Sequence, residues 1–187
     1  GTPWQNGPVP LEFAITGLGP IHIRIAEFDY FKEVLEQAML MREIAKEGSL
    51  HLFEVGEGGN GAQVIVEHNT LLPRGQQGFG TVHHAAFRVA DTNVLKEWID
   101  RMQQLGFSTS GYVDRFFFES LYARVAQGIL FEWATDGPGF MGDEPYETVG
   151  EKLSLPPFLE PKRDEIEAMV RPIDTVRSTK TIEKEYL

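Results

Sequence analysis

The chain has 187 residues, of which 42% are hydrophobic and 24% charged. This is ordinary for a soluble globular protein and is enough for one good-sized domain or two small packed modules. The formal net charge of −11 argues against nucleic acid as a partner, because phosphate binding needs a basic surface. With no cysteine, the chain has no disulfide, thiolate metal ligand or cysteine nucleophile, which is weakly typical of a cytoplasmic protein.

The N-terminal residues 1–14 are rich in Pro and Gly and predict a linker. The sequence opens on Gly1 without an initiating Met or a signal-peptide pattern, so we expect a fragment or a processed chain. No stretch approaches the roughly 18 apolar residues that a membrane span requires, and we therefore expect no membrane partner.

Residues 15–70 are predicted to form a first module. A strand is expected at about Ile21–Phe28, followed by a helix for which Asp29 is a suitable N-cap. Apolar residues at helical spacing carry this helix to about Lys46, and Gly48 is expected to end the segment.

The rest of the first module predicts a hairpin. Ser49–Val55 alternates between apolar and polar residues, and Ala62–His68 is expected to be the return strand. The GEGGNG segment between them, Gly56–Gly61, favours a turn because Gly and Asn accept positive φ angles.

Residues 71–140 are predicted to repeat this order. A strand over Thr81–Val89 leads into a helix that Asp91 or Thr92 caps and that Gly106 ends. Three more strands are expected at residues 107–115, 117–124 and 129–134. Each half thus reads βαβββ, which predicts an α+β fold of paired βαβββ modules forming a curved mixed sheet. Residues 141–187 are expected to form a C-terminal wrap with a short helix and a tail.

The two predicted first strands share a pattern. GPIHIRIAEFD (19–29) aligns without a gap on TVHHAAFRVAD (81–91), which places His22 on His84. The last strand of the second module adds a carboxylate, Glu132, among apolar neighbours. Two His and one carboxylate with open positions form the ligand set of non-haem Fe(II) oxygenases.

Longer runs carry a family resemblance. HHAAFRVAD, GYVDRFFFESLYAR, GILFEWATDGPGF, GEKLSLPPFLEPKRDEIEA and LPRGQQGFGTVHH resemble hydroquinone-type ring-cleaving dioxygenases. These belong to the vicinal oxygen chelate superfamily, with glyoxalase I and the bleomycin-resistance proteins. The similarity covers roughly Pro3 to Pro172 and is to the C-terminal half of family members. It implies a metal cavity between the modules and dioxygen-dependent opening of a hydroxylated aromatic ring.

The resemblance also implies roles for single residues. Fe(II), with Mn(II), Ni(II) or Zn(II) as alternatives, would be held by His22, His84 and Glu132, unless the first ligand comes from an absent N-terminal half. Tyr122 lies ten residues before Glu132, where extradiol enzymes place a tyrosine beside the metal. His68, at a strand end, is a second candidate acid–base group, with an ordinary surface histidine as the alternative.

Alternation along the strand bears on these assignments. It predicts that His84 faces the cavity and that His83 lies on a more covered surface. Glu132 is costly to bury unpaired, so either a metal or a salt bridge to Arg88 or Arg115 is expected to compensate it.

The predicted function is therefore an extradiol-like ring-cleaving dioxygenase whose partners are a small aromatic diol and dioxygen. One alternative is a glyoxalase-like metal-dependent lyase or isomerase, which usually needs a second carboxylate on the metal; the first module offers no obvious mate for Glu132. The other is a metal-free, resistance-type module that binds an aromatic molecule. Because rows of apolar side chains on the sheets would be exposed without a partner, we expect a homodimer or pairing with a missing N-terminal half.

Overall fold

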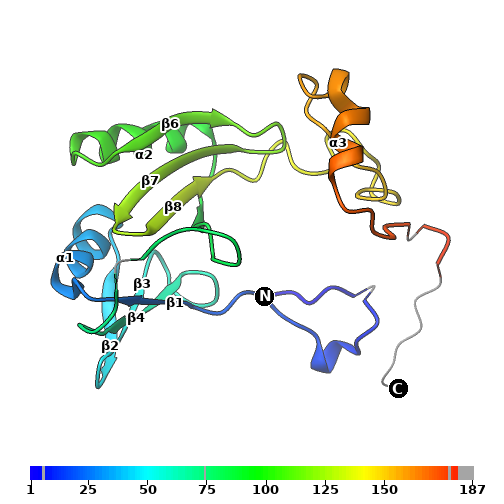
Figure 1. Cartoon of the computed structure of the whole chain (residues 1–187). Helices are drawn as coiled ribbons and strands as arrows, with labels where there is room; N and C mark the ends of the chain where they lie inside the picture. Colours follow the sequence, from blue (N-terminus) through cyan, green and yellow to red (C-terminus); the bar gives the residue numbers. More distant parts are fainter. Residues whose placement is uncertain (6, 74, 177, 181–187) are drawn as a thin grey trace.

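The chain folds into two four-stranded sheets, one of which lies above the other in the view of Figure 1. This is a computed structural model, and it describes residues 1–5, 7–73, 75–176 and 178–180. The first sheet belongs to the N-terminal half and the second to the middle of the chain. The end of the predicted tail, residues 181–187, lies outside the described residues.

The first sheet has the strand order β1-β4-β3-β2. Strand β1 runs parallel to β4, and the other neighbours are antiparallel. Its strands are β1 (Ile21–Ile25), β2 (Arg42–Glu47), β3 (Leu50–Glu54) and β4 (Gln63–His68). The helix α1 (Phe28–Glu33) and the π-helical turn η2 (Val34–Ala38) connect β1 to β2.

The second sheet repeats the first in order and direction, as β5-β8-β7-β6 with β5 parallel to β8. Its strands are β5 (Ala85–Arg88), β6 (Thr109–Asp114), β7 (Glu119–Ala126) and β8 (Ile129–Ala134), and its helix is α2 (Thr92–Gln104). The predicted α+β fold of paired βαβββ modules is confirmed.

The ends of α2 follow the sequence prediction. The Asp91 carboxylate accepts hydrogen bonds from the backbone N–H groups of Asn93 and Val94, at 2.8 and 3.0 Å. These bonds satisfy donors that the first helical turn would leave free. Gly106 follows the helix with a φ of 80°, a left-handed conformation that glycine adopts without strain.

The helix predicted from Asp29 to Lys46 is wrong in its second half. Helical structure ends at Ala38, and Leu40 has a positive φ of 59°, which stops further helical turns. Residues 42–47 pair instead with β3 as an edge strand, and the turn after it contains Gly48, also at positive φ. The first strand is likewise shorter than predicted, because it ends at Ile25 and Phe28 begins α1.

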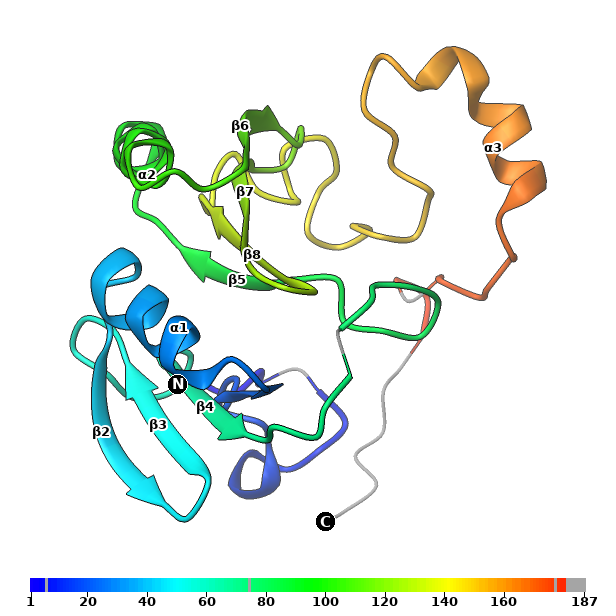
Figure 2. The same ribbon diagram turned by 60° about the vertical axis from the view of Figure 1, so that its left-hand side comes forward.

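The modules share one hydrophobic core. Phe31 of α1 packs edge-to-face on Phe131 of β8, with ring centroids 6.1 Å apart. Arg101 of α2 donates hydrogen bonds to the carbonyl oxygens of Gln37 and Ala38. The helices α1 and α2 therefore lie next to each other, as Figure 2 shows.

The remaining elements are short. The 3-10 helix η1 (Leu11–Phe13) lies in the N-terminal segment, and η3 (Glu160–Lys162) leads into α3 (Arg163–Met169). The segment that carries α3 lies beside the second sheet, away from both module helices (Figure 1). Within the described residues, no helix is both long and apolar enough to cross a membrane.

Candidate active site

Glu132 and His84 meet on one face of the second sheet. Glu132 is buried on the central strand β8, where it pairs in register with Ala86 of β5 and Tyr122 of β7. His84 immediately precedes β5, and its Nε2 lies 2.8 Å from Glu132 Oε2. The two residues that the sequence singled out in this module are thus brought together by the parallel pairing of β5 with β8.

Two polar neighbours complete the surroundings of this pair. The Ser120 hydroxyl, which is fully buried, donates a hydrogen bond of 2.6 Å to Glu132 Oε1. On the other side, His83 Nδ1 lies 2.8 Å from His84 Nδ1. Both Glu132 oxygens therefore have a partner, which offsets the cost of burying the carboxylate.

Tyr122 stands against the same histidine. Its ring lies edge-on to His84, with centroids 5.6 Å apart. Arg115 donates from Nε to the Tyr122 oxygen at 3.2 Å, and its guanidinium lies 5.1 Å from the centre of the Tyr122 ring. Because the oxygen accepts from Arg115, the hydroxyl proton of Tyr122 can be donated to another group.

Arg88 and Arg115, the two salt-bridge partners considered for Glu132, contact other residues. Arg88 Nε lies 3.0 Å from the Asp136 carboxylate, on an exposed part of the surface. Arg115 is engaged by Tyr122. The buried charge of Glu132 is thus met by a histidine and a serine.

The His84–Glu132 pair fits a divalent metal ion. An imidazole nitrogen and a carboxylate oxygen are ligands that iron, zinc and manganese accept. Two ligand atoms about 2.1 Å from one ion and at right angles lie about 3 Å apart, and the observed separation is 2.8 Å. With a metal on Nε2, the remaining proton of His84 sits on Nδ1, where His83 can accept it and hold the ring in place.

The structure does not bring His22 to this pair. His22 Nε2 lies 3.3 Å from Glu67 Oε2 on the first sheet. Among the described residues, no group of three or more His, Asp or Glu side chains is arranged to hold a metal ion. His22 and His84 do border one cavity of about 200 Å³ between the modules, which also includes His83 and Phe131.

His68 and His83 differ in their surroundings. His68 ends β4, and its ring stacks on Phe28 at 5.3 Å, so the structure does not join it to His84 and Glu132. His83 is exposed, and the prediction that it lies on a more covered surface is wrong. The strand begins only at Ala85, so the alternation of faces does not extend back to His83.

Comparisons with known proteins identify relatives of this chain. No protein-family model matches the chain. The predicted ring-cleaving dioxygenase MhqA of Bacillus subtilis (strain 168) is 42% identical over 178 residues, which cover 92% of this chain and 56% of MhqA. The chlorohydroquinone/hydroquinone 1,2-dioxygenase of Sphingobium indicum (strain UT26S) is 30% identical, with coverage of 88% and 52%.

Solved structures give the fold. A crystal structure of a predicted dioxygenase from Bacillus subtilis superposes with a TM-score of 0.85 at 35% identity, over 95% of this chain and 57% of that one. A glyoxylase/bleomycin resistance protein/dioxygenase domain from Frankia sp. EAN1pec gives 0.58 at 13% identity, over 68% and 97%. The chain has the vicinal oxygen chelate fold. Its named sequence relatives are ring-cleaving dioxygenases, and it spans about half their length.

The fold also reveals a residue that the sequence reasoning missed. In a vicinal oxygen chelate fold the two modules correspond strand by strand, so β4 is the counterpart of β8. Glu67 on β4 therefore occupies the place of Glu132, and the statement that Glu132 has no mate in the first module is wrong. Both glutamates follow three apolar residues of their strand, 64–66 before Glu67 and 129–131 before Glu132, but His68 breaks the apolar run after Glu67.

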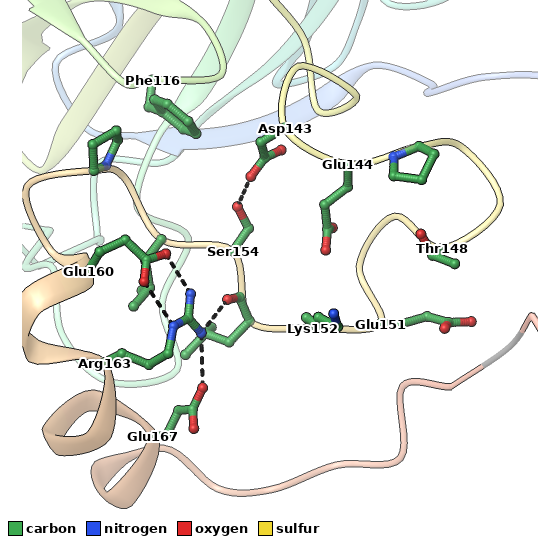
Figure 3. Close-up of a pocket in the computed structure, with 14 residues that line it drawn as sticks. Phe116, Asp143, Glu144, Thr148, Glu151, Lys152, Ser154, Glu160, Arg163 and Glu167 are labelled. Atoms are coloured by element: carbon green, nitrogen blue, oxygen red, sulfur yellow. Dashed lines mark hydrogen bonds and ion pairs between the residues drawn. The ribbon is translucent and has the colours of Figure 1, made fainter.

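A cavity larger than the one beside His84 lies elsewhere in this vicinal oxygen chelate chain. It has a volume of about 1060 Å³ and is bordered by Phe116 and the segment 143–167 (Figure 3). Arg163 is held there by the Glu160 and Glu167 carboxylates, which raise the pKa of its guanidinium. None of the predicted site residues borders this cavity, and its many carboxylates do not match an aromatic diol.

Proposed function

We propose that this chain carries the metal-binding side of an extradiol-type ring-cleaving dioxygenase that acts on a hydroquinone or catechol. The observation that carries the proposal is the 2.8 Å contact between His84 Nε2 and Glu132 Oε2 at the centre of the second sheet. The ring-cleaving dioxygenases among the sequence relatives support the reaction class. The metal would be Fe(II), which when bound supplies adjacent positions for an ionised diol and dioxygen.

The residues around the pair have distinct roles in this proposal. His84 and Glu132 hold the metal, while Ser120 and His83 fix the orientation of these two ligands. Tyr122 is the candidate acid, because Arg115 occupies its oxygen from one side and leaves its proton for a substrate oxygen. The cavity of about 200 Å³ beside His84 has walls of Ile21, Val82 and Phe131, which suit a single aromatic ring.

A third protein ligand is expected from outside this group. His22 is engaged by Glu67, and the described residues provide no third side chain at the pair. The chain spans about half the length of its curated relatives. We therefore propose that the remaining half of a longer protein, or a second copy of this chain, supplies the missing donor.

Anaerobic Fe(II) titration tests the ligand assignment. Glu132→Gln and His84→Ala should each lower iron affinity by about 10- to 100-fold or more, because each removes a charge or a donor atom. His68→Ala, whose ring packs on Phe28, is the matched control and should bind iron as the unaltered chain does. Iron affinity that is unchanged in both Glu132→Gln and His84→Ala would rule out the site.

Oxygen uptake tests the reaction. The iron-loaded chain, alone and mixed with a full-length relative's N-terminal half, is given methylhydroquinone, and the product is followed by mass spectrometry. A product that has gained both atoms of labelled dioxygen is expected. If iron binds at His84 and Glu132 but neither sample consumes oxygen, the metal site would stand and the proposed dioxygenase activity would be contradicted.

The glyoxalase-like alternative gains one observation from the structure. Glu67 is the second carboxylate that such an enzyme would need, and it stands at the position equivalent to Glu132. Glu67 Oε2, however, forms ion pairs with both Arg24 and His22. Activity on a thiohemiacetal with Ni(II) and no oxygen uptake with Fe(II) would favour this alternative.

A further inference from the structure

Strand β2 forms one edge of the first sheet, and β3 is its only partner strand among the described residues. Figure 2 shows β2 on the outer side of this sheet, away from the second sheet. Its residues are all exposed except Glu43, which is half-buried. The free backbone groups of such an edge can pair with a further strand, so the side chains of β2 decide whether the edge is closed or can dock a partner.

A bulge in β2 determines which of its side chains share a face of the sheet. Glu43 is paired with Phe53, whereas Ala45 is paired with the next residue of β3, Leu52. Ile44 is therefore the extra residue of the bulge, and its side chain is exposed. The positions of β2 that pair with β3 are, in order, Arg42, Glu43, Ala45, Lys46 and Glu47. Successive positions in this order point to opposite faces, so the bulge places the first, third and fifth on one face and the second and fourth on the other.

This order of charges is complementary to itself. Two copies of β2 can pair antiparallel about a two-fold axis that passes Ala45 and is perpendicular to the sheet. Arg42 of each copy then lies opposite Glu47 of the other copy, on one face of the joined sheet. Glu43 of each copy lies opposite Lys46 of the other copy, on the opposite face. Every one of these cross-strand pairs joins opposite charges, which is the favourable combination for directly opposite residues.

The complementarity depends on the bulge. In an unbroken strand, odd and even residues point to opposite faces, so a two-fold pairing can match only odd with odd and even with even residues. The central pairings would then set Arg42 against Lys46, or Glu43 against Glu47, and these like charges repel. The extra residue Ile44 removes this conflict, because it moves the two halves of β2 by one position relative to each other.

Half of these charges are already held in place within the chain. Arg42 Nη2 lies 2.6 Å from Glu54 Oε1, and Glu43 contacts a lysine of α1 and a histidine of β3. Lys46 and Glu47 form no ion pair with any of the described residues. A second copy would give these two side chains partners of opposite charge whose orientation is already fixed, which lowers the entropic cost of each new ion pair.

The equivalent edge of the second sheet lacks this pattern. Strand β6 has the sequence TSGYVD and a single charged residue, Asp114, whose carboxylate accepts a hydrogen bond from the Phe116 N–H. Two copies of β6 would therefore form no pair of opposite charges. The self-complementary charges belong to the edge of the first sheet and are not a consequence of the repeated fold.

We propose that β2 is a docking surface for a second copy of this chain, which pairs with it antiparallel about a two-fold axis at Ala45 and joins the two first sheets into one continuous sheet. The contact is one strand wide and its ion pairs are exposed, so the dimer is weak, forms as the chain concentration rises and is weakened by salt. β2 borders neither the His84–Glu132 pair nor the cavity beside it, so the inference stands whether or not that pair binds a metal.

Analytical ultracentrifugation at low salt and increasing chain concentration tests the dimer. The unaltered chain should change from monomer to dimer. The double variant Lys46→Glu, Glu47→Lys keeps the net charge of the chain but sets like charges opposite each other in every pair. Its dissociation constant should therefore rise by about tenfold or more. The matched control, Lys96→Glu, Glu97→Lys, makes the same exchange at two exposed residues of α2 and should dimerise as the unaltered chain does.

Cross-linking locates the axis and does not depend on how well the double variant folds. The chain has no cysteine, so Ala45→Cys introduces a single thiol at the proposed axis. With oxidised glutathione it should form a disulfide-linked dimer faster than Ala90→Cys, an exposed position beyond the end of β5. Equal cross-linking of these two variants would overturn the proposal. So would a chain that stays monomeric at every concentration, which would leave β2 as an edge protected by its charges, or a folded double variant that dimerises as tightly as the unaltered chain.

Discussion

Ser120→Ala is expected to destabilise the second module through Glu132. The Ser120 hydroxyl is fully buried and donates to Glu132 Oε1 at 2.6 Å. Alanine keeps the packing of β7 but removes this donor from a buried carboxylate. Hydrogen bonds to charged groups contribute about 1.5–3 kcal/mol, and since water is excluded here we expect a loss of about 2–3 kcal/mol in the free energy of unfolding.

Urea unfolding followed by tryptophan fluorescence measures this loss. Trp133 is adjacent to Glu132 and buried, so it reports on the site. With a urea dependence of about 2 kcal/mol per molar, the midpoint should fall by about 1 M. Ser110→Ala is the control, because Ser110 is exposed and water can replace its hydrogen bond to the Tyr122 N–H. Equal midpoints for the Ser120 and Ser110 variants would refute the reasoning.

Three other changes test separate parts of the molecule. Gly128→Ala should lower the free energy of unfolding by about 2–4 kcal/mol. Gly128 has a φ of 74°, and a Cβ there would lie 2.7 Å from the backbone oxygen of Gly75. An unchanged melting temperature in thermal unfolding would contradict this close contact. Tyr122→Phe should reduce oxygen uptake by about 100-fold or more while iron content is retained, whereas Tyr112→Phe, whose hydroxyl bonds Glu119, should behave as the unaltered chain. The hydrogen bond from Lys32 lowers the pKa of Glu43 below 4.5, so the stabilisation from this ion pair is full above that pH and is lost as the pH falls through the lowered pKa. Lys32→Met should therefore make the free energy of unfolding in urea less sensitive to acid pH. An unchanged dependence of stability on pH would argue against the Lys32–Glu43 ion pair.

Much of the second module could be predicted because its signals are local. Asp91 and Gly106 mark the ends of α2 by side-chain capping and positive φ, which depend only on neighbouring residues. Glu132 drew attention because a carboxylate inside an apolar strand needs a partner. Its contact with His84 confirms that such a partner exists, although the metal itself stays a prediction.

The first module was harder because longer-range pairing overrides local preference. Residues 42–47, REIAKE, are good helix formers, yet they form the edge strand β2 against β3. Glu67 was missed for a related reason. Its equivalence to Glu132 depends on which residue of β1 lies beside which residue of β4, and register is fixed by the assembled sheet.

The repeated register of the two sheets makes one final prediction. Ala86→Arg should close the His84–Glu132 pair, because it places a guanidinium where the first module has one beside Glu67. The side chain of Ala86 is exposed, so the larger residue can be accommodated without filling the core. Iron affinity should fall by about tenfold or more. Ala90→Arg, exposed and beyond the end of β5, is the control for added charge. An equal fall in iron affinity in both variants would mean that the added charge acts by general repulsion, while unchanged affinity in Ala86→Arg would show that position 86 does not control metal binding at the His84–Glu132 pair.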